Sequence, residues 1–169
     1  MKKIAFVLMI VVAGVHCGYH LRGTGSALPS HIRVMHVPMF VNRTTRFELD
    51  LKLTQKVVDE LVSRGKVEIT DDSQTADAVL LGEILSFRAS PIAFTGEGIA
   101  DRYSITIVAK VVVRDRAKKK VLFSNPSFIY QGEYEVPEGS DFESVETEAI
   151  DEIVERFARS LVVNILEGF

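Results

Sequence analysis

The chain contains a single cysteine, Cys17, which follows an N-terminal segment laid out like a secretory signal peptide. Lys2 and Lys3 give this segment a positive start, and residues 4–13 form an unbroken apolar run. The run is too short to span a bilayer, because a spanning helix needs about 20 apolar residues. Cleavage before Cys17 would expose its thiol and amine for acylation, as in bacterial lipoproteins. The residue before the cysteine in those proteins is normally Gly, Ala or Ser, whereas here it is His16.

The position and uniqueness of Cys17 therefore predict a lipid anchor. Each buried methylene adds about 0.8 kcal/mol, so two or three acyl chains would tether the protein stably to a membrane. The alternative is that Cys17 is an incidental thiol behind an ordinary signal peptide.

A second group of chemically active side chains consists of five bases within seven residues. They lie in a predicted reverse turn of a hairpin: Arg114, Arg116, Lys118, Lys119 and Lys120. Guanidinium and ammonium groups form charge-assisted hydrogen bonds with phosphates, so this turn could bind lipid phosphates. The alternative is that the lysines keep an exposed hairpin soluble and block edge-to-edge pairing. An apolar loop at residues 91–94 could contact a partner or acyl chains, or cover the end of a sheet.

Other site chemistries find no support in the residue pattern. Three histidines remain after cleavage, His20, His31 and His36, and none has the i, i+4 helical spacing of a zinc pair. A nucleophile elbow of the form G-x-S-x-G is missing. The acids between residues 138 and 148 lack the spacing of a calcium-binding loop. The sequence predicts no catalytic residue, metal or cofactor, and hence a protein that is not an enzyme.

Length and composition fit one globular domain. The chain has 169 residues, of which 47% are hydrophobic and 25% charged. Residues 1–16 are predicted to be the signal peptide, 17–30 an acylated tether and 31–169 the domain. The chain after cleavage carries 18 bases and 23 acids, a net charge of −5. This charge disfavours duplex DNA as a partner, because binding there depends on neutralising phosphates.

The apolar periodicity predicts two helices among several strands. The first helix begins at a capping box formed by Thr45 and Glu48 and ends at Gly65. Its predicted apolar stripe contains Phe47, Leu51, Val58, Leu61 and Val62. The second begins at a capping box formed by Ser140 and Glu143. Its wide stripe contains Ile150, Ile153, Val154, Phe157, Ala158, Leu161, Val162 and Ile165.

Strands are predicted at residues 32–40, 67–70, 78–87, 103–113 and 121–134. Pro38 marks an edge or the end of the first strand, and Asn125 with Pro126 marks a bulge in the last. Alternation places Tyr103, Ile105, Ile107, Ala109, Val111 and Val113 on one face. The order of elements predicts an α+β fold with two amphipathic helices on one face of a mostly antiparallel or mixed sheet of about four strands.

Several short motifs resemble the lipopolysaccharide-assembly lipoproteins, the LptE family. The start of the mature chain resembles that family's acylated Cys-Gly-aromatic followed by a His-Leu-Arg-Gly-like stretch; here it reads Cys17-Gly18-Tyr19-His20-Leu21-Arg22-Gly23. Support comes from Leu28-Pro29, from residues 40–44 before the first helix and from residues 76–82 in a middle strand.

The resemblance implies an outer-membrane lipoprotein that faces the periplasm. Such a protein plugs a large β-barrel translocon, an LptD-like lipopolysaccharide-assembly protein, helps it fold and helps insert lipopolysaccharide into the outer leaflet. It also implies lipopolysaccharide binding by basic residues at one end of the domain, for which Arg116, Lys118, Lys119 and Lys120 are the candidates by charge and placement. Two alternatives stay open: an unrelated periplasm-facing lipoprotein serving as a structural or binding module of the envelope, and a secreted enzyme.

Overall fold

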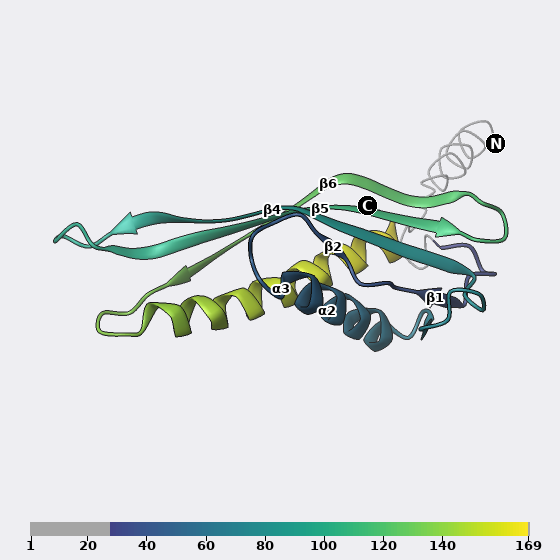
Figure 1. Cartoon of the computed structure of the whole chain (residues 1–169), viewed down its shortest axis with the longest axis horizontal. Helices are drawn as coiled ribbons and strands as arrows, with labels where there is room; N and C mark the ends of the chain where they lie inside the picture. Colours follow the sequence, from purple (N-terminus) through teal and green to yellow (C-terminus); the bar gives the residue numbers. More distant parts are fainter. Residues whose placement is uncertain (1–27, 169) are drawn as a thin grey trace, which may run out of the picture.

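The computed structural model describes residues 28–168, in which six strands and two helices form two layers (Figure 1). The strands are β1 (Val34–His36), β2 (Val41–Asn42), β3 (Glu68–Thr70), β4 (Ala78–Phe94), β5 (Ala100–Asp115) and β6 (Val121–Glu135). The helices are α2 (Leu49–Arg64) and α3 (Phe142–Glu167), and both lie on the same face of the sheet (Figure 1). The predicted α+β class is confirmed.

The sheet is mixed, with the order β3-β1-β4-β5-β6 and with β2 also paired to β4. β1 runs parallel to β3 and β4, whereas β4, β5 and β6 form a long antiparallel meander. The sheet has six strands where about four were predicted. The predicted strand at 32–40 is reduced to β1, which ends before Pro38, and the separate short strand β2 follows the proline. Proline cannot donate to a ladder, so the strand breaks there.

The core lies between the helices and one face of the sheet. Ile105, Ile107, Ala109, Val111 and Val113 of β5 are fully buried on that face, as the alternation predicted. Every residue of the predicted α3 stripe is also buried. The β5–β6 register shifts between Ala109, which pairs with Phe128, and Val111, which pairs with Asn125. This shift confirms the bulge predicted near Pro126.

The predicted apolar face of α2 is wrong in most of its members. Phe47 is 90% exposed, and Leu51 and Val62 are more than half exposed. The buried face instead contains Leu49, Leu53, Val57 and Leu61, which recur at i, i+4 spacing. α2 carries apolar side chains on both faces, so its own periodicity did not single out the face that packs against α3.

Both predicted capping boxes are also wrong. α2 begins after Glu48, which has a left-handed φ of 57° and makes no side-chain cap. Residues 42–46 before it form a turn in which Asn42 Oδ1 accepts from the N–H and hydroxyl of Thr44. α3 is capped by Asp141, whose side chain accepts from the N–H of Ser144, whereas the hydroxyl of Ser140 donates to the carbonyl of Pro137.

The apolar segment at 91–94 is strand, not loop. β4 extends to Phe94 and pairs with β5 as far as Ala100. On the side of β4 away from β5, no strand pairs beyond Ile84 within the described residues, and the β4–β5 register shifts next to Pro91. The sheet therefore tolerates a proline, which has no N–H to donate, at position 91. In residues 28–168 neither helix is long and apolar enough to span a bilayer.

Candidate functional site

The basic turn, residues 114–120, connects β5 to β6 and is organised by the one acid within it. Asp115 is only 1% exposed. Its backbone N–H donates to the carbonyl of Lys120 at 2.8 Å, and its Oδ1 accepts from the backbone N–H of Lys118 at 2.8 Å. Lys119 takes a positive φ of 53° at the tip. The buried carboxylate thus closes the turn and leaves Lys118, Lys119 and Lys120 exposed to solvent.

Arg116 has a different environment from the lysines. Its backbone N–H donates to the carbonyl of Asp77 at 2.9 Å. Its guanidinium donates to the carbonyl of Ala76 at 3.1 Å and to Oε1 of Gln74 at 3.4 Å. Arg116 therefore ties the basic turn to the segment between β3 and β4, and only part of its hydrogen-bonding capacity is open to a ligand.

The chain entering the domain is hydrogen-bonded to this same turn. His31 Nε2 lies 2.7 Å from Oδ2 of Asp115, and the contact becomes an ion pair when the ring is protonated. Oδ2 of Asp77 accepts from the backbone N–H groups of Arg33 and Val34, each at 2.9 Å. The first described residues and the basic turn consequently lie at the same end of the molecule (Figure 1).

Hydrogen bonding keeps both carboxylates ionised. The backbone N–H of Lys118, followed by the His31 ring, holds the pKa of Asp115 below its ordinary value. The backbone N–H groups of Arg33 and Val34 likewise lower the pKa of Asp77. These acids offset part of the positive charge at the base of the turn, but the three exposed lysines and Arg114 have no ion-pair partner among the described residues.

Sequence reasoning missed His31, Asp77 and Asp115 as the residues that build this end. Asp115 had a visible signal, since it is the only acid in an otherwise basic turn. Asp77 and His31 had none, because their partners lie 43 and 84 residues away along the chain.

The other candidate residues are not brought to this site. Cys17 and His20 lie outside the described residues. Residues 91–94 are at the opposite end of the sheet, where Ile92 and Phe94 are exposed. Within residues 28–168 no three His, Cys, Asp or Glu side chains are grouped to hold a metal ion.

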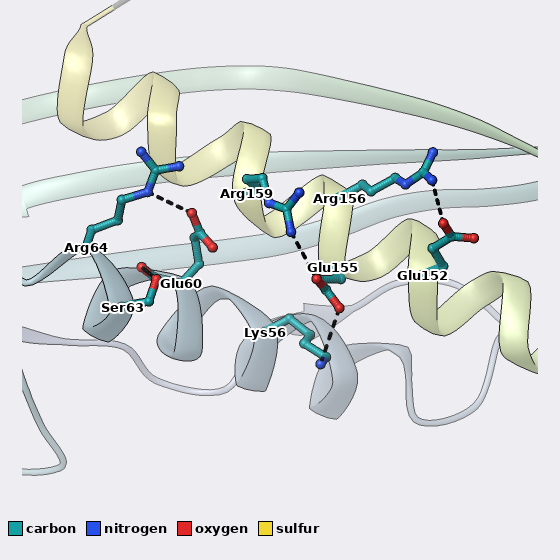
Figure 2. A network of polar contacts seen from close by, with 8 residues as sticks. All are labelled: Lys56, Glu60, Ser63, Arg64, Glu152, Glu155, Arg156 and Arg159. Carbon is teal, nitrogen blue, oxygen red and sulfur yellow. Dashed lines mark hydrogen bonds and ion pairs between the residues drawn. The ribbon is translucent and has the colours of Figure 1, made fainter.

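The acids of α3 form part of a charged helical surface. Figure 2 shows Lys56 of α2 paired with Glu155 of α3, while Arg156 and Arg159 pair with Glu152 and Glu155 along α3 itself. Two further pairs join Lys52 to Asp151 and Arg46 to Glu146, the latter at 2.9 Å. Apart from the partly buried Arg46–Glu146 pair, these pairs are largely exposed and contribute little stability, so the acids serve mainly as a solvated surface.

The fold places the chain in a class of small α+β domains that includes bacterial lipoproteins of known structure. A hypothetical protein of Chlamydia trachomatis is 16% identical with a TM-score of 0.56, covering 81% of this chain and 96% of that one. Uncharacterized lipoprotein B of Nitrosomonas europaea is 11% identical with a TM-score of 0.50, covering 86% and 91%. At these identities the likeness concerns the fold alone.

The family assignment comes from the sequence. The model of the LptE family, described as lipopolysaccharide-assembly, matches residues 32–165. The match covers most of the chain, and the chain belongs to this family, as the N-terminal and middle-strand motifs predicted. Comparison with curated protein sequences finds no match.

Proposed function

We propose that this protein is a lipid-anchored subunit of the outer-membrane machinery that assembles lipopolysaccharide. The family match over residues 32–165 carries the proposal. In this proposal, residues 1–16 are removed as a signal peptide and Cys17 is acylated. Residues 31–169 then form a domain on the periplasmic side of the outer membrane. The domain plugs an LptD-like β-barrel translocon, assists its assembly and helps deliver lipopolysaccharide to the outer leaflet. None of these roles requires catalysis by the chain.

The basic turn is the proposed contact for the phosphates of lipopolysaccharide. The side chains of Lys118, Lys119 and Lys120 are exposed and form no ion pair with the residues that the structure describes, so they are available to bind an anion. Arg116 is proposed to hold the turn in place through Ala76 and Gln74 and to offer its remaining N–H groups to the ligand.

Purification of the full-length, tagged lipoprotein from native membranes in mild detergent tests the partner. We expect a β-barrel protein of several hundred residues to co-purify. Intact-mass analysis of the same material should show a chain that begins at an acylated Cys17. A different partner without a barrel would favour an unrelated envelope lipoprotein, and an unmodified thiol at residue 17 would contradict the anchor.

Charge reversal tests the basic turn. The double substitution Lys118→Glu and Lys119→Glu should weaken binding of purified lipopolysaccharide by roughly tenfold or more at low salt, and the difference should shrink as salt is added. Lys66→Glu with Arg88→Glu is the matched control, because both side chains are exposed and the change in charge is the same. Equal binding by the two double variants would contradict the proposed phosphate contact.

A further inference from the structure

The face of the sheet opposite the helices holds an apolar groove at its basic end. The groove has a volume of about 390 Å³, within the range of about 300–1,000 Å³ typical of ligand sites. Its apolar lining consists of Pro38, Met39, Val41, Leu81 and Val112, and its charged lining consists of Glu83, Lys110 and Arg114. Met39, Val41 and Leu81 are each more than 40% exposed, so a contiguous apolar surface meets solvent here.

Local packing fixes the apolar side of the groove. Phe40 is 2% exposed and lies on the helix side of the sheet, where its ring occupies the space that a Cβ at Gly82 would need. The backbone N–H of Phe40 donates to Thr54 Oγ1 of α2 at 2.9 Å. Because side chains alternate along an extended segment, burying Phe40 holds its neighbours Met39 and Val41 on the outer side. The groove is thus built by the same contacts that seat α2.

Strand register places the cations beside the apolar residues. Leu81 pairs with Val112, while Glu83 pairs with Lys110 one step along the same face. Arg43 Nε donates to Oε1 of Glu83 at 2.9 Å. This charged hydrogen bond lowers the pKa of Glu83 and offsets much of its negative charge. Arg114 follows Val112 on the same face and begins the basic turn. The groove therefore leads from an apolar floor to Arg114, the first residue of the basic turn.

We propose that this groove receives an acyl chain of lipopolysaccharide while a phosphate of the same molecule lies against Arg114 and the basic turn. The inference rests on the proposed function and adds a place for the apolar part of its cargo. A purely solubilising role for the lysines would not call for an apolar groove beside them. An apolar floor with a cationic margin complements a molecule that is anionic at one end and hydrocarbon at the other.

Site-specific photocrosslinking in the full-length protein tests the occupant. A photoreactive amino acid at position 81, activated in native envelopes, should yield an adduct detected by antibody to lipopolysaccharide. Ile129 is the matched control, because it is 60% exposed on the same outer face but does not line the groove. An adduct at position 81 consisting of a protein, either the barrel or a second copy of this chain, would overturn the inference.

Binding of purified lipopolysaccharide separates this inference from the proposed function. Leu81→Asn should weaken binding by roughly fivefold or more, because the lost contact is apolar, and should leave its salt dependence unchanged. Ile129→Asn should bind like the wild type. Wild-type binding that Leu81→Asn does not alter overturns the groove alone, whereas no binding by the wild type overturns both proposals. Equal displacement by phosphatidylglycerol vesicles would show that ordinary phospholipid is the occupant and would also overturn the inference.

Discussion

Asp115 decides the geometry of the basic end. Its carboxylate lies within the basic turn, where Oδ1 accepts a hydrogen bond from the backbone N–H of Lys118 and Oδ2 contacts the His31 ring. Asp115 therefore both closes the turn and binds the chain entering the domain. Because the Asp115 side chain is only 1% exposed, hydrogen bonds and not solvent stabilise its ionised form. The turn that Asp115 closes leaves Lys118, Lys119 and Lys120 exposed.

Acidification should therefore weaken the contacts that Asp115 makes at this end. The pKa of Asp115 is lower in the folded than in the unfolded chain, so its contribution to stability is present above the ordinary pKa near 4 and is lost as the pH falls through the folded value. Asp115→Asn should lower the free energy of unfolding at pH 7. Below about pH 4, the free energy of unfolding of this variant should fall less steeply with decreasing pH than that of the wild type. Urea denaturation across pH 2–7 measures both. Asp71→Asn, at an exposed turn position, is the control, and a decline of unchanged steepness in Asp115→Asn would contradict the assignment.

α3 shows how an element depends on a single residue at its start. The helix runs for 26 residues and buries one continuous stripe against β5, β6 and α2. Its first turn rests on Asp141, whose carboxylate accepts from both the N–H and the hydroxyl of Ser144 and whose pKa is lowered by those bonds. Ser140 matches the sequence signature of a cap equally well, but its hydroxyl donates to Pro137.

Two adjacent substitutions distinguish the observed cap from the one predicted by pattern. Asp141→Ala should lower the melting temperature by roughly 2–4 °C, because the first turn loses its acceptor. Ser140→Ala should change it by less, because that residue makes only a local turn contact. Thermal unfolding followed by far-ultraviolet circular dichroism gives the comparison. A larger decrease in melting temperature for Ser140→Ala than for Asp141→Ala would show that Ser140 caps the helix, as the sequence motif indicates.

The whole molecule is elongated and electrically polarised. The basic turn and the first described residues lie at one end, and the β4–β5 loop lies at the other (Figure 1). The far end is acidic, with Glu97, Glu133, Glu135 and Glu138 among its exposed side chains. Leu28 lies eleven positions after the proposed anchor at Cys17, a span of at most about 40 Å, so acylation would hold the basic end within that distance of the bilayer.

The far end of the sheet should be the least stable part of the domain. β4 has no strand partner on its outer side beyond Ile84, and β5 pairs with β6 only as far as Arg102. The end of the β4–β5 hairpin, residues 93–101, is therefore held mainly by its own two-stranded ladder, which is marginally stable on its own. Amide hydrogen exchange should be at least about tenfold faster in residues 91–101 than in residues 107–113 of the same hairpin. Equal protection in the two segments would show that the ribbon is as firmly held as the core. Exchange in residues 80–84 serves as the internal reference.

The sequence alone determined the class of fold, the family and the elements with strong periodicity. The β5 alternation and the α3 stripe predicted their buried faces, because in each case only one face is continuously apolar. The basic turn was visible because charges clustered in sequence also cluster in space. Short sequence motifs predicted the family, and the family match over residues 32–165 confirms it; neither depends on the folded structure.

Tertiary structure decided the features that depend on residues far apart in the chain. α2 has apolar residues on both faces, and only contact with α3 and the sheet selects Leu49, Leu53 and Leu61. The groove arises where residues near 40, 81 and 112 meet across three strands. Strand register and helix packing are set by the total burial of the whole core, so no local window of sequence contains the information that fixes them.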